Sequence, residues 1–338
     1  MGLKVSDVGE FELIERIQRI IKNSSCRPGN LIHGIGDDTA VFSPEPGQEM
    51  LVTCDSMVEG YHYLKGHITP YEIGKRAMVM NISDIGAMGG KPLYALVNAG
   101  LTHSESVRNI EELYRGLISE LEPFGASIIG GNITKVSGSR IIDITLIGSV
   151  KKESMVLRSG AGVGDSIMVT GWPGRSAAGY WLVSNGISES VQNEILVDAY
   201  VRPQHRAKEG YAIAESGKIT SMIDLSDGLS SDLSHICEKS KVGAELQEDM
   251  LPSCEAMDLL SGVQGMGVCD FILGASDDYE LLFTCLPKDR QEITAILSGF
   301  DCHVSHIGNI VPGSEGITFV SKSGKKKKLE KKGWDHFA

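Results

Sequence analysis

The sequence predicts an α+β protein of two domains, residues 1–150 and 151–338. Its 338 residues exceed the roughly 100–200 that are typical of one domain. Segments with helical and with strand periodicity are mixed, without the steady repeat of a doubly wound sheet. A charged turn, Lys151–Glu153, follows the last strand pattern of the first half and marks a plausible boundary. We expect one sheet in each domain, covered on one face by helices.

The first half opens with isoleucines at helical spacing over residues 11–21, which predict an amphipathic helix. The apolar run Met50–Cys54 predicts a buried strand that ends at Asp55. A second helix is expected from Thr69-Pro70 to about Met88, because Thr can cap a helix and Pro suits its first position. Further strands are predicted at residues 93–101, 127–129 and 141–150, and a helix at residues 104–124.

The second half shows the same mixture of patterns. Strands are predicted at residues 166–170, 219–224 and 279–285, and helices at residues 174–183, 206–216 and 230–240. Since no short-period repeat is visible, a solenoid or propeller is disfavoured.

Composition excludes several classes of function. The formal net charge is −12, which disfavours sequence-independent binding of nucleic acid. The basic run Lys325–Lys328 is typical of a solvated hairpin, although a patch for an anionic partner is the alternative. No apolar run approaches the roughly 20 residues of a membrane span, so no membrane association is expected. The seven cysteines form no CxxC pair, so neither a zinc knuckle nor a thioredoxin-type motif is indicated. A chain of this size does not need disulfides for stability, and a reducing cytoplasm is expected.

Aspartates that follow apolar segments are the main chemical signal. They stand at Asp37-Asp38, Asp55, Asp84, Asp224, Asp227 and Asp277-Asp278. One Asp in a turn usually caps the backbone, but carboxylates that converge repel one another and need cations. Ligand sets of oxygen atoms favour hard cations, so the pattern predicts Mg²⁺. Asp84 adds to this, because a carboxylate on an otherwise apolar helix must be paired or bound to metal.

Short glycine loops supply a second signal. Glycine makes up 40 of the 338 residues, about 12% against a usual ~7%. Loops such as Gly34-Ile35-Gly36, Gly130-Gly131 and Gly160-Ala161-Gly162 let backbone N–H groups approach phosphate oxygens. Together with the aspartates and Arg158, they favour phosphoryl transfer. The sequence has neither a P-loop nor the protein-kinase motifs, and no dinucleotide-binding fingerprint.

The aspartates and glycines belong to longer segments, which follow one another along the chain as Gly34-Ile35-Gly36-Asp37-Asp38, Cys54-Asp55, Val58-Glu59-Gly60 with His62, Asn81-Ile82-Ser83-Asp84-Ile85 with Ala87-Met88-Gly89, Gly130-Gly131-Asn132, Arg158-Ser159-Gly160, Asp224-Leu225-Ser226-Asp227-Gly228-Leu229, Asp278-Tyr279-Glu280-Leu281 and Gly333-Trp334-Asp335-His336-Phe337. In this order, the segments resemble the thiamine-monophosphate kinase family, within the superfamily of aminoimidazole ribonucleotide synthetase. The resemblance covers essentially the whole chain.

The resemblance implies a reaction and an architecture. The family transfers the γ-phosphoryl group of ATP to thiamine monophosphate and makes thiamine diphosphate, by in-line transfer between Mg²⁺-bound phosphates. The implied fold has two domains of the aminoimidazole ribonucleotide synthetase-like type. The mixed sheet of the N-terminal domain (1–150), which binds ATP and Mg²⁺, is expected to form a barrel with its copy in a homodimer. The C-terminal α+β domain (151–338) is expected to complete the nucleotide and substrate site.

The resemblance also implies roles for individual residues. The implied Mg²⁺ ligands are Asp38, Thr53, Cys54, Asp55, Asp84, Asn132, Asp224 and Asp227, of which Asp55, Asp84 and Asp227 are expected to be catalytic. The implied contacts of ATP are Tyr114, Gly131, Asn132, Arg158 and Ser226. The implied contacts of thiamine monophosphate are His62, Asp277 and Trp334, although a lone His beside two Tyr is by itself more often structural.

Two positions depart from the family pattern. Asn132 stands where an Asp is common and keeps an oxygen but not the charge. Asp277 stands where a Glu is common and is one methylene shorter. Two alternative functions therefore stay open: another ATP-dependent member of the superfamily with a different acceptor, or a non-catalytic nucleotide-binding regulator.

Overall fold

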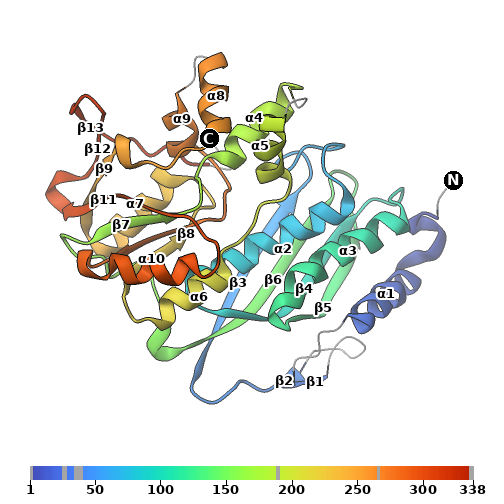
Figure 1. The fold of residues 1–338 in the computed structure, drawn as a ribbon. Coiled ribbons are helices and arrows are strands. Elements are labelled where there is room, and N and C mark those ends of the chain that lie inside the picture. The colour runs from blue at the N-terminus through green and yellow to red at the C-terminus, as the bar shows by residue number, and fades with distance from the viewer. Residues whose placement is uncertain (1–2, 25–28, 34–40, 188–190, 265–266, 335–338) are drawn as a thin grey trace. The chain divides into compact units, whose positions relative to one another are not determined.

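A computed structural model of the chain describes residues 3–24, 29–33, 41–187, 191–264 and 267–334 (Figure 1). The chain divides into two compact units. The first comprises Met1–Ile85 with Gly90–Lys152, and the second comprises Gly86–Gly89 with Glu153–Ala338. The boundary expected at residue 150 and the task assigned to each half stay predictions. None of the helices in the described ranges is long and apolar enough to span a bilayer.

The first unit is built on a mixed sheet of four strands, in the order β3-β6-β4-β5. The β4–β5 pair is parallel and the other two pairs are antiparallel. Helices α2 and α3 lie along one face of this sheet (Figure 1). The elements are α1 (Val5–Asn23), β1 (Leu31–His33), β2 (Val41–Phe42), β3 (Gln48–Val58), α2 (Pro70–Ala87), β4 (Lys91–Leu101), α3 (Val107–Leu121), η1 (Glu122–Phe124), β5 (Ser127–Lys135) and β6 (Ile141–Lys151).

Helix α2 begins as its sequence predicts. Pro70 is its first residue, and the Thr69 hydroxyl accepts a hydrogen bond from the Glu72 N–H at 3.3 Å. The Glu72 carboxylate accepts one in return from the Thr69 N–H at 2.8 Å, so the pair forms a reciprocal cap. Glycines bring α2 close to α3, because a Cβ on Gly74 or Gly116 would lie 2.0 Å from a backbone oxygen of the other helix.

Strand β3 differs from its prediction in length and burial. It continues past Asp55 to Val58, and its side chains alternate between the two faces of the sheet. Leu51 and Met57 are buried on one face, whereas Val52 on the other is 66% exposed. The prediction of a buried strand ending at Asp55 is therefore wrong, because only one face of the sheet packs against helices.

The second unit is built on a mixed sheet of seven strands, in the order β13-β12-β9-β11-β7-β10-β8. Only the β12–β9 pair is parallel. The elements are η2 (Lys152–Ser154), β7 (Ser166–Thr170), α4 (Arg175–Ser184), α5 (Val191–Val201), α6 (Ala207–Glu215), β8 (Ile219–Asp224), α7 (Leu229–Ser240), β9 (Val242–Gln247), η3 (Glu248–Met250), α8 (Glu255–Gln264), α9 (Val268–Leu273), β10 (Leu281–Cys285), η4 (Pro287–Asp289), α10 (Arg290–Ser298), β11 (Val304–Pro312), η5 (Gly313–Glu315), β12 (Ile317–Val320) and β13 (Lys326–Lys328).

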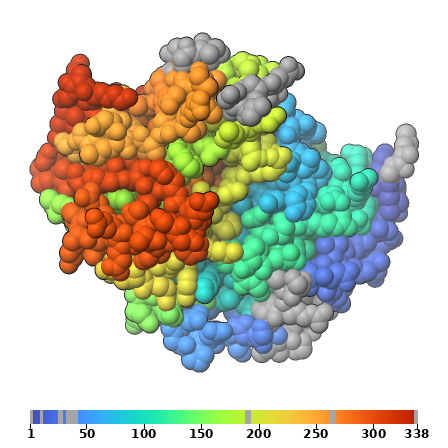
Figure 2. All heavy atoms as spheres, in the orientation of Figure 1, coloured from blue at the N-terminus to red at the C-terminus, as the bar shows by residue number. Residues whose placement is uncertain are grey.

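Helices cover both faces of this second sheet. On β10, Leu282 belongs to a core with helices α4, α5, α7, α8 and α9, while Phe283 belongs to a core with α6 and α10. All five residues of β10 are buried, as are all five of β7. Helix α10 forms the outer surface of one of these faces (Figure 2). The expectation that helices would cover only one face is wrong for this unit.

Candidate functional site

In the first unit, polar side chains of β3 and α2 meet on the face of the sheet that the helices cover. The Thr53 hydroxyl donates a hydrogen bond to Oδ2 of Asp84 at 2.5 Å. The Asp55 N–H donates to Oδ1 of Asn81 at 3.2 Å. Asn81 and Asp84 are three residues apart on α2 and so share a face of that helix. The strand and the helix thus bring together Thr53, Asp55 and Asp84, as a shared site requires.

Cys54 lies between these residues in sequence but on the opposite face of the sheet. Its thiol is 3.7 Å from Oδ1 of Asp143. That carboxylate also accepts hydrogen bonds from the Ser56 hydroxyl at 2.6 Å and from the Asn98 amide at 3.1 Å. The thiol thus faces away from Thr53 and Asp84, and only the main chain of Cys54 remains for the predicted metal contact.

The turn after β3 holds His62 in one tautomer. The Val58 N–H donates to Nδ1 of His62 at 3.1 Å, which places the proton of the neutral ring on Nε2. The next residue, Tyr63, is buried and its hydroxyl reaches Glu59. This hydrogen bond gives His62 a structural role within its own turn. The contact of His62 with thiamine monophosphate stays a prediction.

The predicted ATP contacts of this unit lie on β5 and α3. Gly131 has φ +145°, and a Cβ there would lie 2.0 Å from the Val97 oxygen on β4. Asn132 pairs with Asn98 on β4 and is exposed. Tyr114 is buried in α3, and this burial raises the pKa of its phenol. Asp38 and the first glycine loop lie outside the described residues.

In the second unit, the predicted ligands follow β8. Asp224 is the last residue of that strand and is 1% exposed, as the sequence indicates. Ser226 is exposed in the turn that follows, and Asp227 is partly buried. Gly228 has φ +115°, and a Cβ there would lie 2.0 Å from the Gly274 oxygen. Glycine is therefore required where this turn passes the loop before β10.

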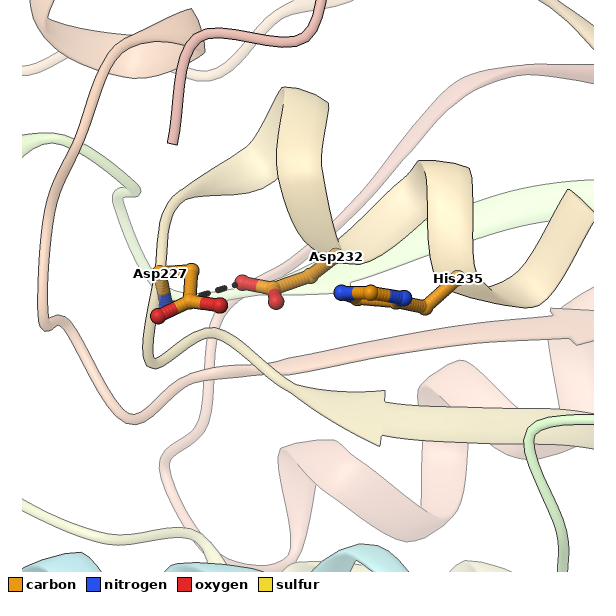
Figure 3. Close-up of side chains that lie close together, drawn as sticks. All are labelled: Asp227, Asp232 and His235. Atoms are coloured by element: carbon orange, nitrogen blue, oxygen red, sulfur yellow. Dashed lines mark hydrogen bonds between the residues drawn. The ribbon is translucent and has the colours of Figure 1, made fainter. Parts of the chain in front are cut away.

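Asp227 belongs to a cluster with two side chains of α7, Asp232 and His235 (Figure 3). One ligand atom of each lies within 4.8 Å of the others. Oδ2 of Asp232 accepts hydrogen bonds from the N–H groups of Asp227, at 3.2 Å, and Gly228, at 3.0 Å. Asp232 and His235 were not predicted as site residues, although they stand three residues apart in the predicted helix that follows Asp227.

Burial dominates the electrostatics of this cluster. It raises the pKa of Asp232 to about 7, and the charge of Asp227 acts in the same direction. The two backbone N–H groups and Arg158 act in the opposite direction. Burial also lowers the pKa of His235, and the charges of Lys331 and Arg158 add to that effect. Arg158 itself is exposed, so the predicted ATP contact lies within electrostatic range of these side chains.

The loop before β10 caps helix α4. The backbone N–H groups of Gly174 and Ser176 donate to Asp278 at 2.6 and 2.9 Å. The Ser176 hydroxyl donates to Asp277 at 2.5 Å, and the Ala177 N–H donates to the Ser276 hydroxyl at 3.2 Å. Burial raises the pKa of Asp278 to about 6. The predicted substrate contact Asp277 is therefore held beside the N-terminus of α4.

A buried ion pair holds the end of the same loop. Arg206 donates from Nε and Nη2 to the two carboxylate oxygens of Glu280, at 2.7 and 2.8 Å. The Thr170 hydroxyl donates to the same carboxylate at 2.6 Å. This ion pair was not predicted, because Arg206 and Glu280 are 74 residues apart in the sequence.

The C-terminal segment lies against the turn that holds Asp227. The Trp334 N–H donates to the Asp227 carbonyl at 3.1 Å. The Lys332 N–H donates to the Ser230 hydroxyl at 3.0 Å. Trp334 is 46% exposed and lies beside the predicted metal ligand.

The donor atoms in both units fit a hard divalent cation. The first unit offers the hydroxyl of Thr53 and the carboxylates of Asp55 and Asp84, and the second offers those of Asp224 and Asp227. All are oxygen atoms, and Asp224 is a carboxylate almost without solvent contact. Such a group needs a compensating charge, and oxygen donors of this kind suit Mg²⁺.

Comparison with known proteins places the chain among AIR synthase related proteins. The model of the N-terminal domain of that family matches residues 36–150, and the model of its C-terminal domain matches residues 162–321. Thiamine-monophosphate kinase of Escherichia coli (strain K12) is 32% identical over 332 residues, which cover 98% of each chain.

Two solved structures share the fold over nearly the whole chain. The crystal structure of thiamine-monophosphate kinase from Stenotrophomonas maltophilia K279a is 29% identical with a TM-score of 0.81, and the match covers 94% of this chain and 97% of that one. The structure of AaThiL complexed with AMPPCP and TMP is also 29% identical, with a TM-score of 0.76 and 99% of each chain covered.

Proposed function

This chain belongs to the thiamine-monophosphate kinase family, and we propose on that premise that it transfers the γ-phosphoryl group of ATP to thiamine monophosphate. The products are thiamine diphosphate and ADP. The observation that carries the proposal is the pairing of Thr53 with Asp84 beside Asp55, together with the Asp224–Asp227 turn. Both are groups of oxygen donors of the kind that phosphoryl transfer between two anions requires.

The acceptor needs little activation by the protein. A phosphate monoester has a second pKa of about 6, so its oxygen is already anionic at neutral pH. The difficulty is to bring two negatively charged molecules together and align them. A site rich in carboxylates suits this task when cations are bound, and the exposed guanidinium of Arg158 adds a fixed positive charge.

The proposed cofactor is Mg²⁺, and ATP is the co-substrate. Thr53, Asp55 and Asp84 in the first unit, and Asp224 and Asp227 in the second, would hold cations, with Asp38 and Asn132 as further predicted ligands. When bound, Mg²⁺ would neutralise charge on the phosphates of donor and acceptor. Gly131 would offer its N–H to ATP, with Ser226 and Tyr114 as further contacts. His62, Asp277 and Trp334 would contact thiamine monophosphate. A cytoplasmic location remains part of the proposal.

The proposal includes a homodimer formed through the sheet of the first unit. Val52 of β3 is 66% exposed and Ile141 of β6 is 37% exposed. Both lie on the face opposite α2 and α3, where the Asp143 cluster also lies. Exposed apolar side chains on a sheet face that helices leave uncovered favour association with a second sheet.

An assay of ADP release tests the proposed function. Purified protein is incubated with ATP and Mg²⁺, with and without thiamine monophosphate. We expect ADP and thiamine diphosphate in equal amounts, and only when thiamine monophosphate is present. Release that ignores thiamine monophosphate but responds to another phosphate or amide acceptor would favour another reaction of the superfamily. Tight binding of ATP without turnover would favour a regulator.

A further inference from the structure

We propose that Asp232 is a positioning residue, which holds the main chain at Asp227 and Gly228 so that the Asp227 carboxylate meets the divalent cation. This inference rests on the proposed function, since it takes Asp227 as a metal ligand. Asp232 itself acts through hydrogen bonds to the backbone and does not bind the cation.

Both polar backbone groups of Asp227 form hydrogen bonds. Its N–H donates inward to Oδ2 of Asp232 at 3.2 Å. Its carbonyl accepts outward, from the N–H groups of Trp334 at 3.1 Å and Ser276 at 3.4 Å. With both polar backbone groups engaged, the Cα–Cβ bond from which the Asp227 carboxylate extends is held in one direction.

The turn at Gly228 depends on a hydrogen bond to Asp232. The φ of Gly228, +115°, belongs to a region that other residues rarely adopt, and the neighbour of Gly228 across the turn is the Gly274 backbone. The Gly228 N–H donates to the same Oδ2 of Asp232 at 3.0 Å. One buried carboxylate oxygen therefore satisfies two consecutive N–H groups of an unusual turn, and removing it would leave both without their acceptor.

The position of Asp232 agrees with this role. It is 2% exposed, lies in the first turn of α7, and stands between Asp227 and His235 (Figure 3). Residues that orient a metal ligand commonly occupy such a place, and their loss typically weakens metal binding 10–100-fold. An Asn in the same place keeps one acceptor oxygen and the shape of the side chain but loses the charge.

Three substitutions test the proposal: Asp232→Ala, Asp232→Asn and Asp232→Ser. The readout is the Mg²⁺ concentration at half-maximal formation of thiamine diphosphate, with a melting temperature for each variant. We expect an increase of about tenfold or more for Asp232→Ala. We expect Asp232→Asn to stay within about threefold of the wild type. Asp232→Ser keeps an acceptor oxygen on a shorter side chain, and it replaces Asp232→Ala in the comparison if the Ala variant does not fold.

Asp165 provides a matched control, because it is also a buried aspartate of the second unit. It is 3% exposed and accepts hydrogen bonds from the Gly162 N–H at 2.9 Å and the Thr220 hydroxyl at 2.7 Å. Asp165→Ala should lower the melting temperature without changing the Mg²⁺ concentration at half-maximal rate. A change in that concentration equal to that of Asp232→Ala would show a general effect of stability and overturn the proposal.

Binding of Mn²⁺, followed by electron paramagnetic resonance, separates this inference from the proposed function. It needs no turnover, so weaker Mn²⁺ binding by Asp232→Ala than by Asp232→Asn supports a positioning role even for a protein that uses another acceptor. Equal binding by Asp232→Ala and the wild type would refute the proposal. Equal weakening in the Ala and Asn variants would refute it too, because Asp232 would then act through its own charge.

Discussion

Asp84 shows how a single carboxylate is accommodated on an apolar helix. Its neighbours Ile82 and Ile85 are buried, while the Asp84 carboxylate accepts the Thr53 hydroxyl hydrogen bond. A charged group in such a place costs stability unless it is paired. The presence of Asp84 on this helix is consistent with a role in catalysis, because catalytic residues commonly lower the stability of the folded protein.

We expect Asp84→Asn to lower the rate of thiamine diphosphate formation at least about 100-fold, the scale of removing one preorganised electrostatic contact. The melting temperature should stay the same or rise, because the variant no longer holds a charge on an apolar helix. Rate and melting temperature are measured together. Thr53→Ser, which keeps the hydroxyl, is the control and should retain most activity. A near wild-type rate for Asp84→Asn would remove Asp84 from the metal site.

We predict that Asp278 makes the free energy of unfolding depend on pH. Its pKa is raised from 3.8 to about 6 in the folded protein, mainly by burial. The folded state therefore binds the proton more tightly than the unfolded state, and the stabilisation by that proton is full below pH 3.8 and lost as the pH rises through 6.

Comparison with Asp278→Asn isolates this dependence, since Asn does not titrate. The free energy of unfolding of the wild type minus that of the variant should decrease as the pH rises from about 4 to 7. Urea titrations at four pH values in that range measure it. A difference that stays constant or increases with pH would show that folding does not raise the pKa of Asp278.

Single residues differ in how far their sequence reveals their role. Asp84 was predictable as a paired carboxylate because its helix is apolar, and Asp224 because an apolar strand precedes it. The contacts of Asp232 and Asp278 could not be predicted in this way. Asp232 accepts hydrogen bonds from backbone N–H groups of an unusual turn, and Asp278 accepts them from the start of a helix about 100 residues away. Such contacts depend on the tertiary fold and leave no local pattern in the sequence.

Among the elements, β5 depends on a close approach to β4 at Gly131. The Cβ of any other residue would lie 2.0 Å from the Val97 oxygen, and the φ of +145° would add strain. The parallel pairing of these strands therefore relies on glycine at this position, independently of any contact with ATP.

Gly131→Ala should lower the free energy of unfolding by more than about 1 kcal/mol, because both the contact and the backbone angle are unfavourable. Gly138, in the turn between β5 and β6, is the matched control, since a Cβ there meets no atom within 4 Å. Gly138→Ala should change stability by less than about 0.5 kcal/mol. Equal effects in urea denaturation would show that the approach to β4 does not matter.

Elements with local signals were predicted well, whereas elements that depend on packing were not. Helix α2 begins at Pro70 with its predicted Thr69 cap, and β8 spans Ile219–Asp224 as expected. Strand β3 was interpreted as buried because Met50–Cys54 is apolar, yet it alternates between a covered and an exposed face. Helices α5 and α10 were not predicted, because their sequence patterns alone do not show which of their side chains pack against the sheet.

At the scale of the whole molecule, the resemblance carried more information than composition. Composition indicated two α+β domains but suggested helices on one face of each sheet. The second sheet is covered on both faces, which its uniformly buried central strands β7 and β10 require. Local patterns did not show this, because a five-residue apolar run is compatible with either arrangement.

The proposed homodimer predicts that Val52→Arg weakens association. A charged side chain in the interface between two sheets would lose its solvent, and the Asp143 carboxylate on this face is already engaged by Ser56 and Asn98. Size-exclusion chromatography with light scattering should show a dimer for the wild type and a shift towards monomer for the variant. Leu259→Arg is the control, because Leu259 is 50% exposed on α8 of the second unit. A monomeric wild type, or equal behaviour of both variants, would contradict the proposed interface.

The most direct test is anomalous diffraction from a crystal grown with Mn²⁺, a nonhydrolysable ATP analogue and thiamine monophosphate. We predict manganese peaks within about 2.5 Å of a carboxylate oxygen of Asp84 and of one of Asp227, with phosphate oxygens of the bound ligands among the other contacts of the ions. Peaks absent from these carboxylates, in a crystal where both ligands are present, would contradict the proposal that these aspartates hold the cations for phosphoryl transfer.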